Sequence, residues 1–134
     1  MTALLVVVAL FGALAYLRLY APQRVPFRSD PSAICSETLT AWARSQKLAA
    51  DPDVSVKIPI SLVPTEIAQL GSTNAMSVRI LPQTKPEAYV VISFGGAFHS
   101  WGMIIGSTNL SSGDAPRGYA EIIKPGYLIY NTYQ

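Results

Sequence analysis

A run of fifteen apolar residues opens the chain and constrains its fold more than any other feature. It begins at Ala3 and ends at Leu17, and no charged residue interrupts it. An α-helix rises about 1.5 Å per residue, so a helix over residues 2–21 would be about 30 Å long, which matches the hydrocarbon core of a bilayer. We therefore expect a transmembrane anchor helix over residues 2–21, in contact with the lipid bilayer.

A cleaved signal peptide is the alternative interpretation of this run. Ala13-Leu14-Ala15 has the small residues of a cleavage site. A signal peptide also starts with a positively charged segment, whereas only Met1 and Thr2 precede the apolar core here. The missing positive charge favours an uncleaved anchor.

Aromatic and basic residues near the end of the run predict how such an anchor would lie. Tyr16, Arg18 and Tyr20 fall where the helix would meet the lipid headgroups, a level that favours Tyr rings and snorkelling Arg side chains. Arg24 and Arg28 follow before the first acidic residue. Because basic residues beside a span favour the cytoplasmic side, we expect a single-pass protein with its N-terminus outside and its C-terminal domain in the cytoplasm. A periplasmic or extracellular domain is the alternative.

Charge and cysteine content narrow the function classes. The chain carries 10 basic and 8 acidic residues, and three of the basic ones precede the first acidic residue. The rest of the chain therefore has no basic field of the kind that binds nucleic acid. A single cysteine excludes an intrachain disulfide and a cysteine-rich metal site, and no glycine-rich nucleotide-binding motif occurs. We expect no nucleic-acid partner, no cofactor and no metal.

The remainder of the chain predicts one small domain behind a short linker. Residues 22–30 hold two prolines and two arginines, which is typical of an extended juxtamembrane linker, and residues 31–134 suffice for one core. Asp30 suits a helix N-cap and Pro31 suits the first helical position. Apolar residues then recur at helical spacing from Cys35 to Ala43, which predicts one main helix that ends near residue 51.

Six later stretches have the length and the apolar pattern of strands. They are Val54–Ile60, Ala75–Leu81, Ala88–Phe94, Gly102–Gly106, Tyr119–Ile123 and Tyr127–Tyr133. The third, which is apolar almost throughout, is the expected central strand, and Pro59 places the first at an edge or makes its end irregular. The expected fold class is α+β: an N-terminal transmembrane helix, then one main helix packed on an antiparallel sheet of about five or six strands.

The single cysteine and the single histidine form the one pair with a catalytic interpretation. A Cys near a helix start and a His near a strand occur in papain-like hydrolases, where the helix dipole and the imidazole lower the thiol pKa. Residues 98–106 also resemble the histidine strand of the small NlpC-type cysteine peptidases, which implies a membrane-tethered hydrolase that uses Cys35 and His99. The chain departs from that pattern at Ser100 and Trp101, where the family has a small apolar residue and a glycine. We favour a buried structural Cys35 and expect no catalytic residue.

Aromatic residues gather in the last third of the chain. Tyr and Trp combine a large apolar area with a polar tip, and they are enriched at protein interfaces. The candidate partner contacts are Phe98, Trp101, Tyr127, Tyr130 and Tyr133.

Together these patterns predict a non-catalytic role. We expect a single-pass accessory subunit that stabilises a larger membrane protein complex, such as a respiratory or photosynthetic one, with other membrane-protein subunits as partners. The cysteine hydrolase is one alternative. A free-standing envelope module that binds a peptide or a lipid through an exposed strand edge is the other.

Overall fold

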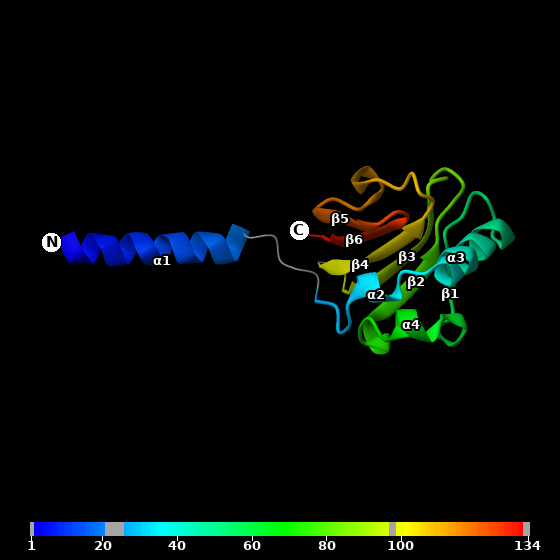
Figure 1. Cartoon of the computed structure of the whole chain (residues 1–134), viewed down its shortest axis with the longest axis horizontal. Coiled ribbons are helices and arrows are strands. Elements are labelled where there is room, and N and C mark those ends of the chain that lie inside the picture. The colour runs from blue at the N-terminus through cyan, green and yellow to red at the C-terminus, as the bar shows by residue number, and fades with distance from the viewer. Residues whose placement is uncertain (1, 21–25, 97–98, 133–134) are drawn as a thin grey trace.

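The computed structural model describes residues 2–20, 26–96 and 99–132. An N-terminal helix, α1 (Thr2–Tyr20), precedes an α+β domain built on one antiparallel sheet (Figure 1). The six strands run in the order β1-β2-β3-β4-β6-β5. Their bounds are β1 Val56–Ile58, β2 Met76–Ile80, β3 Ala88–Gly95, β4 Ser100–Gly106, β5 Tyr119–Lys124 and β6 Tyr127–Asn131. The α+β class and the antiparallel sheet are therefore confirmed, with β3 inside the sheet and β1 at an edge.

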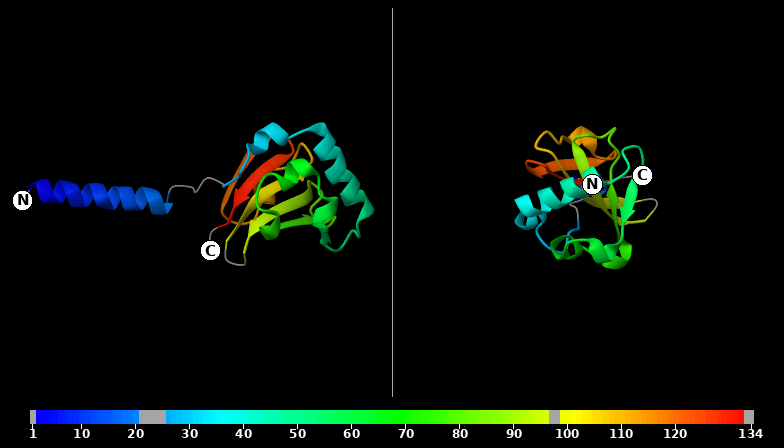
Figure 2. Two further views of the ribbon diagram at one scale, coloured as in Figure 1. Left: turned by 90° about the horizontal axis from the view of Figure 1, so that it is seen from below. Right: turned by 90° about the vertical axis from the view of Figure 1, so that its right-hand side faces the viewer.

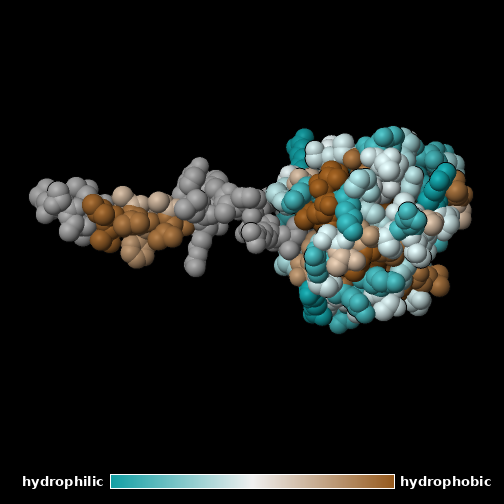
Figure 3. All heavy atoms as spheres, viewed as in Figure 1, coloured by the Kyte–Doolittle hydropathy of each residue, from teal (hydrophilic) through white to brown (hydrophobic). Residues whose placement is uncertain are grey.

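The predicted transmembrane span is wrong. No helix in the described part of the chain is long and apolar enough to cross a membrane. Side chains are described in α1 from Val6 to Ala15, where they are apolar (Figure 3), and at about 1.5 Å per residue they cover about 15 Å of a bilayer core about 30 Å thick. The fold class with a membrane anchor and the single-pass description are thus corrected to an α+β domain preceded by a helix.

The residues expected at a membrane interface have no common place in the structure. Tyr16, Arg18 and Tyr20 lie in the last turns of α1, beyond its described side chains. Arg24 lies outside the described residues, and Arg28 is exposed at the start of the domain. The orientation predicted from the arginines depends on the span, and no feature of the described residues tests it.

The one helix predicted after residue 30 is in fact two. Helix α2 (Pro31–Ile34) is capped by Asp30 as expected, but Cys35 is already extended and a new helix, α3 (Glu37–Ala49), begins after Ser36. The Ser36 side chain accepts a hydrogen bond from the Leu39 backbone N–H at 3.3 Å, which makes it a second N-cap. The remaining helical elements are α4 Thr65–Ala68 and the 3₁₀ turns η1 Ile60–Leu62, η2 Thr73–Ala75 and η3 Ser112–Asp114.

The helices cover one side of the sheet, here called the helix face (Figure 2). Alternate strand residues point to this face, and Val78, Ile92 and Met103 are fully buried there under Leu39 and Ala43 of α3. Burying apolar area of this kind supplies most of the stability of such a domain.

The opposite side, here called the open face, is covered by none of the α-helices that the structure describes. The loop over residues 107–118 lies against part of it and inserts Leu110 into a small cluster with Ile104 and Leu128. A β-bulge between Ala88 and Val90 places these two residues in different clusters, Ala88 on the open face and Val90 on the helix face. An antiparallel sheet tolerates such a partly solvated face.

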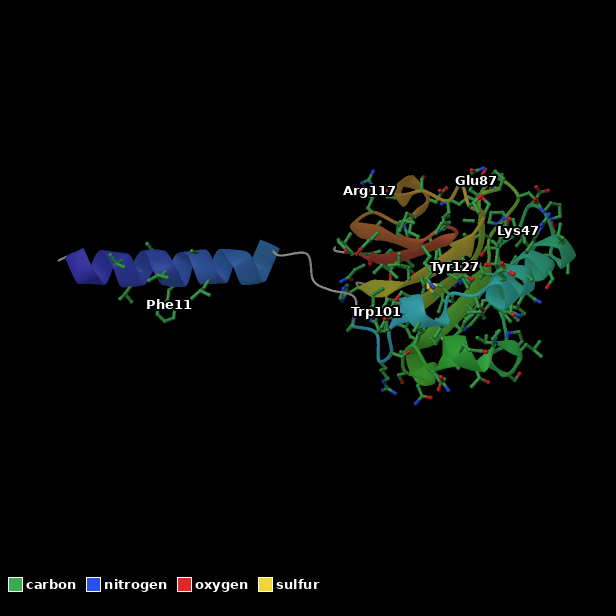
Figure 4. The ribbon with its side chains drawn as sticks, in the orientation of Figure 1. Phe11, Lys47, Glu87, Trp101, Arg117 and Tyr127 are labelled. Carbon is green, nitrogen blue, oxygen red and sulfur yellow. The ribbon has the colours of Figure 1, made fainter. Side chains whose placement is uncertain are left out.

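A buried lysine fixes α3 to the turn between β2 and β3. Lys47 is only 5% exposed, and its Nζ donates to the backbone carbonyls of Pro82 at 2.7 Å, Lys85 at 3.0 Å and Ala88 at 2.8 Å (Figure 4). An ammonium has three N–H donors, so this side chain is fully satisfied without a carboxylate. Burial lowers the pKa of Lys47.

Part of the predicted linker belongs to the domain. Phe27 packs edge-on against Trp101, with ring centroids 5.2 Å apart, and Trp101 stacks on Phe94 at 4.5 Å. The Arg28 N–H donates to the Leu70 carbonyl at 2.9 Å. The folded domain therefore begins before residue 31.

Candidate functional site

The most apolar hollow of the domain lies between α3 and the ends of β4 and β6, and we call it the α3 groove. It encloses about 740 Å³, which is within the range of pockets that bind ligands. One wall is a stripe along α3 formed by Glu37, Thr40, Ala41, Arg44, Ser45 and Leu48. The other wall comes from strand ends and turns and consists of Tyr89, Gly106, Ser107, Thr108, Lys124 and Pro125.

Helical periodicity produces the first wall. Leu39, Ala43 and Lys47 form the buried stripe of α3. The residues that directly follow them in the sequence, Thr40, Arg44 and Leu48, lie on the neighbouring face of the helix and line the groove. Leu48 ends this wall of the groove with a side chain that is 73% exposed. A large apolar side chain that is this exposed beside a hollow is available for contact with another molecule.

Tyr127 forms the floor of the groove and joins its walls. Its ring is 4% exposed, and its hydroxyl donates to the Ser36 carbonyl at 2.5 Å and lies 2.7 Å from Thr40 Oγ1. Burial raises the pKa of the Tyr127 hydroxyl, so it stays protonated at neutral pH and serves as a fixed donor. The start of α3 is thereby attached to β6.

The charges on the groove are few and mainly positive. Arg44 and Lys124 are exposed on opposite walls, and Glu37 is the carboxylate that lines the groove. Ala41 and Leu48 add apolar surface to the wall that carries Arg44. The arrangement suits an apolar group that carries negative charge at its edge.

Cys35 lies at one end of this groove as a poor nucleophile. The thiol is half-buried and donates to the Pro31 carbonyl at 3.1 Å. Burial raises its pKa to about 11, and the nearby positive charge of Lys124 offsets this only in part. Because the thiolate is the reactive form, a cysteine in this state reacts slowly at neutral pH.

The structure does not bring the predicted Cys–His pair together. Cys35 lies near Lys124 in the groove that Gly106 lines from the C-terminal end of β4, whereas His99 precedes Ser100 at the other end of β4. At about 3.3 Å per residue this strand is about 20 Å long. His99 Nε2 lies 2.6 Å from Asn131 Oδ1, which belongs to the neighbouring strand β6. No Cys–His dyad is therefore assembled in this conformation.

The predicted aromatic contacts are scattered through the domain. Tyr127 and Tyr130 are 4% and 1% exposed and lie in the clusters of the helix face and the open face, respectively. Trp101 is partly buried between Phe27 and Phe94 at the end of the sheet nearer to α1 (Figure 4). The two others, Phe98 and Tyr133, lie outside the described residues.

The strand edges bear on the alternative of peptide binding. β1 and β5 are the outer strands of the sheet. β1 has three residues, and β5 is interrupted by a bulge after Ile122 and carries Glu121 and Lys124. Short, bulged and charged edges are features that discourage the addition of a further strand. Binding at a strand edge stays a prediction, and the α3 groove is the better candidate.

Within the described ranges, no group of three or more His, Cys, Asp or Glu side chains is placed to hold a metal ion. Sequence reasoning missed the α3 groove because it followed the apolar face of the helix only. The signal was present, since Ala41, Arg44 and Leu48 recur at spacings of three and four residues.

Comparison with known proteins adds no relative to this description. No protein-family model, curated protein or solved structure matches the chain.

Proposed function

We propose that the chain is a non-catalytic accessory subunit whose domain docks a partner protein in the α3 groove. The observation that carries the proposal is the exposed Leu48, which lies on the α3 wall of the groove with Ala41 and Arg44, while Lys124 lies on the other wall. An exposed leucine beside an open hollow contributes little to the stability of the free domain, whereas its burial by a partner contributes about 1.5–3 kcal/mol to binding.

The groove favours one kind of occupant. It is open along its length and bordered by a helix, so an amphipathic helix can place a row of apolar side chains in it. The positive charges on both walls favour Asp or Glu beside those apolar residues. We therefore infer an amphipathic, acidic helix of a partner protein as the docked segment.

The experiment compares two exposed leucines. The full chain is purified from its own cells as wild type, Leu48→Asp and Leu62→Asp, and the mass of each assembly is measured under native conditions. Leu62 is 66% exposed on η1 and does not line the α3 groove, so it is a matched control. We expect a stoichiometric complex for the wild type and the control, and its loss for Leu48→Asp.

Two results would contradict the proposal. A wild-type chain that migrates as a monomer or a homo-oligomer has no partner subunit. A complex that survives Leu48→Asp forms through another surface, and the α3 groove is then not the docking site.

A further inference from the structure

The open face of the sheet carries a second groove that is chemically different from the first. It encloses about 520 Å³ between strands β2, β3, β4 and β6 and the loop over residues 107–118, a size suited to a small ligand. Its lining includes the polar side chains of Ser77, Arg79, Lys85, Ser93 and Tyr130. We call it the open-face groove.

Positive charge is concentrated at one side of this groove. Arg79 and Lys85 line it with exposed side chains, and Lys57 lies directly opposite Arg79 in the register of β1 and β2. Like charges directly opposite each other on neighbouring strands destabilise a sheet. The repulsion between Lys57 and Arg79 therefore destabilises the sheet here, and a bound anion would reduce that repulsion.

One carboxylate in the lining of this groove already accepts hydrogen bonds within its own loop. Asp114 lines the groove, but its Oδ2 accepts from the Ser111 backbone N–H at 2.8 Å and from Ser111 Oγ at 3.0 Å. The first of these bonds, together with the bond from the Asp114 backbone N–H to the Ser111 side chain, forms the capping box of η3. Asp114 therefore shapes the loop, and the guanidinium of Arg79 and the ammonium of Lys85 remain available to an anion.

A row of hydroxyl groups crosses the floor of the groove. Ser77 and Ser93 face each other on β2 and β3, and Ser93 Oγ lies 2.5 Å from the Tyr130 hydroxyl. Tyr130 reaches this far because its partner on β4 is Gly102, which has no side chain to block the ring. The Ser77 hydroxyl makes no hydrogen bond to any residue that the structure describes and is free to donate to a ligand.

We propose that the open-face groove binds a small phosphate monoester. Arg79 and Lys85 lie where they can contact the phosphate, since a guanidinium donates two parallel hydrogen bonds to an oxyanion and an ammonium adds a compact charge. The Ser77 and Ser93 hydroxyls supply polar contacts to the phosphate and to the hydroxyl-bearing part of the ligand. The two cations match the double negative charge of the phosphate. A neutral sugar or a single carboxylate would leave at least one of them without a partner.

The test is a titration of the full chain with glycerol phosphate, followed by the backbone amide NMR signals of β2 and β3. We expect saturable shifts at Ser77, Arg79 and Ser93, with a dissociation constant of about 1 mM or lower. Arg79→Met and Lys85→Met should each weaken binding about tenfold, the usual effect of losing one charge-assisted hydrogen bond. Arg28→Met, an exposed arginine on the other side of the sheet, should leave the affinity unchanged.

The controls separate a specific phosphate site from charge screening and from a peptide site. Equal shifts with sodium chloride at the same ionic strength would show charge screening alone and overturn the proposal. So would the absence of saturation, or an unchanged affinity in Arg79→Met when signals remote from the groove show that the variant is folded. Tighter binding of a phosphoserine peptide than of glycerol phosphate would overturn the assignment to a small molecule.

Discussion

Replacing Lys47 by methionine should destabilise the domain measurably. The variant keeps a similar chain length but loses the three hydrogen bonds from Nζ to the carbonyls of Pro82, Lys85 and Ala88. A hydrogen bond from a charged donor contributes about 1.5–3 kcal/mol, but burying the ammonium costs several kcal/mol, so the side chain's net contribution is well below the sum of its bonds. The carbonyl of buried Ala88 loses its donor away from water, which costs about 1–3 kcal/mol.

We expect Lys47→Met to lower the free energy of unfolding by about 2 kcal/mol and the Tm by about 10 °C. Urea and thermal unfolding, followed by circular dichroism, measure both. Lys124→Met is the matched control because this lysine is exposed, and it should change stability by less than about 0.5 kcal/mol. A Lys47→Met variant as stable as the wild type, or more stable, would refute the reasoning, because the desolvation cost would then outweigh the three bonds.

Three further predictions follow from single contacts. Tyr127→Phe removes the hydroxyl bonded to Ser36 and Thr40 and should cost about 1–2 kcal/mol in urea unfolding, whereas Tyr89→Phe should cost little. Gly102→Ala places a Cβ 1.8 Å from the Ile92 carbonyl oxygen and should cost about 3 kcal/mol or prevent folding, while Gly96→Ala, with nothing within 4 Å, should be tolerated on the same assay. Since the raised pKa of Cys35 is about 11, alkylation by iodoacetamide at pH 8 should be about a hundredfold slower than in the unfolded chain. The pKa of Cys35 is higher in the folded chain than in the unfolded chain, so its contribution to the free energy of unfolding is present below about pH 9 and falls as the pH rises from about 9 to 11. Fast alkylation of the folded chain at pH 8 would contradict the raised pKa.

The sheet could be predicted because its strands follow local rules. Period-two alternation located β2, and the near-continuous apolar run located β3. The predicted strands over residues 119–123 and 127–133 correspond to β5 and β6, and Gly126 in the turn between them has a φ of +81°, which glycine adopts readily. Each of these patterns involves only residues that are close together in the sequence, so the sequence alone is enough to recognise the strands.

The break between α2 and α3 and the burial of Lys47 were not predictable by the same means. An apolar periodicity that runs through Cys35 and Leu39 looks continuous, and the competing N-cap at Ser36 becomes evident only from its bond to the Leu39 N–H. Lys47 continues the buried stripe of Ala43, yet a lysine is expected at the surface unless its charge is satisfied. The three carbonyls that satisfy it come from a turn 35 to 41 residues further along the chain.

The α3 groove and the open-face groove arise from tertiary structure in the same way. Leu48 and Lys124 lie far apart in the sequence and meet across one hollow. Arg79 and Lys57 become neighbours only through the register of β1 with β2. The transmembrane span predicted from the apolar run and its flanking residues is wrong, since no described helix is long and apolar enough to cross a membrane.

Site-directed photo-cross-linking in the chain's own cells is the measurement that tests the docking proposal most directly. A benzophenone amino acid replaces Ala41 in the α3 groove or, in the control, Ala33, which is exposed on α2 and lines neither groove. The account predicts one defined protein adduct from position 41, its loss when Leu48→Asp is added, and no such adduct from position 33. No protein adduct from position 41, or the same adducts from both positions, would contradict docking in the α3 groove.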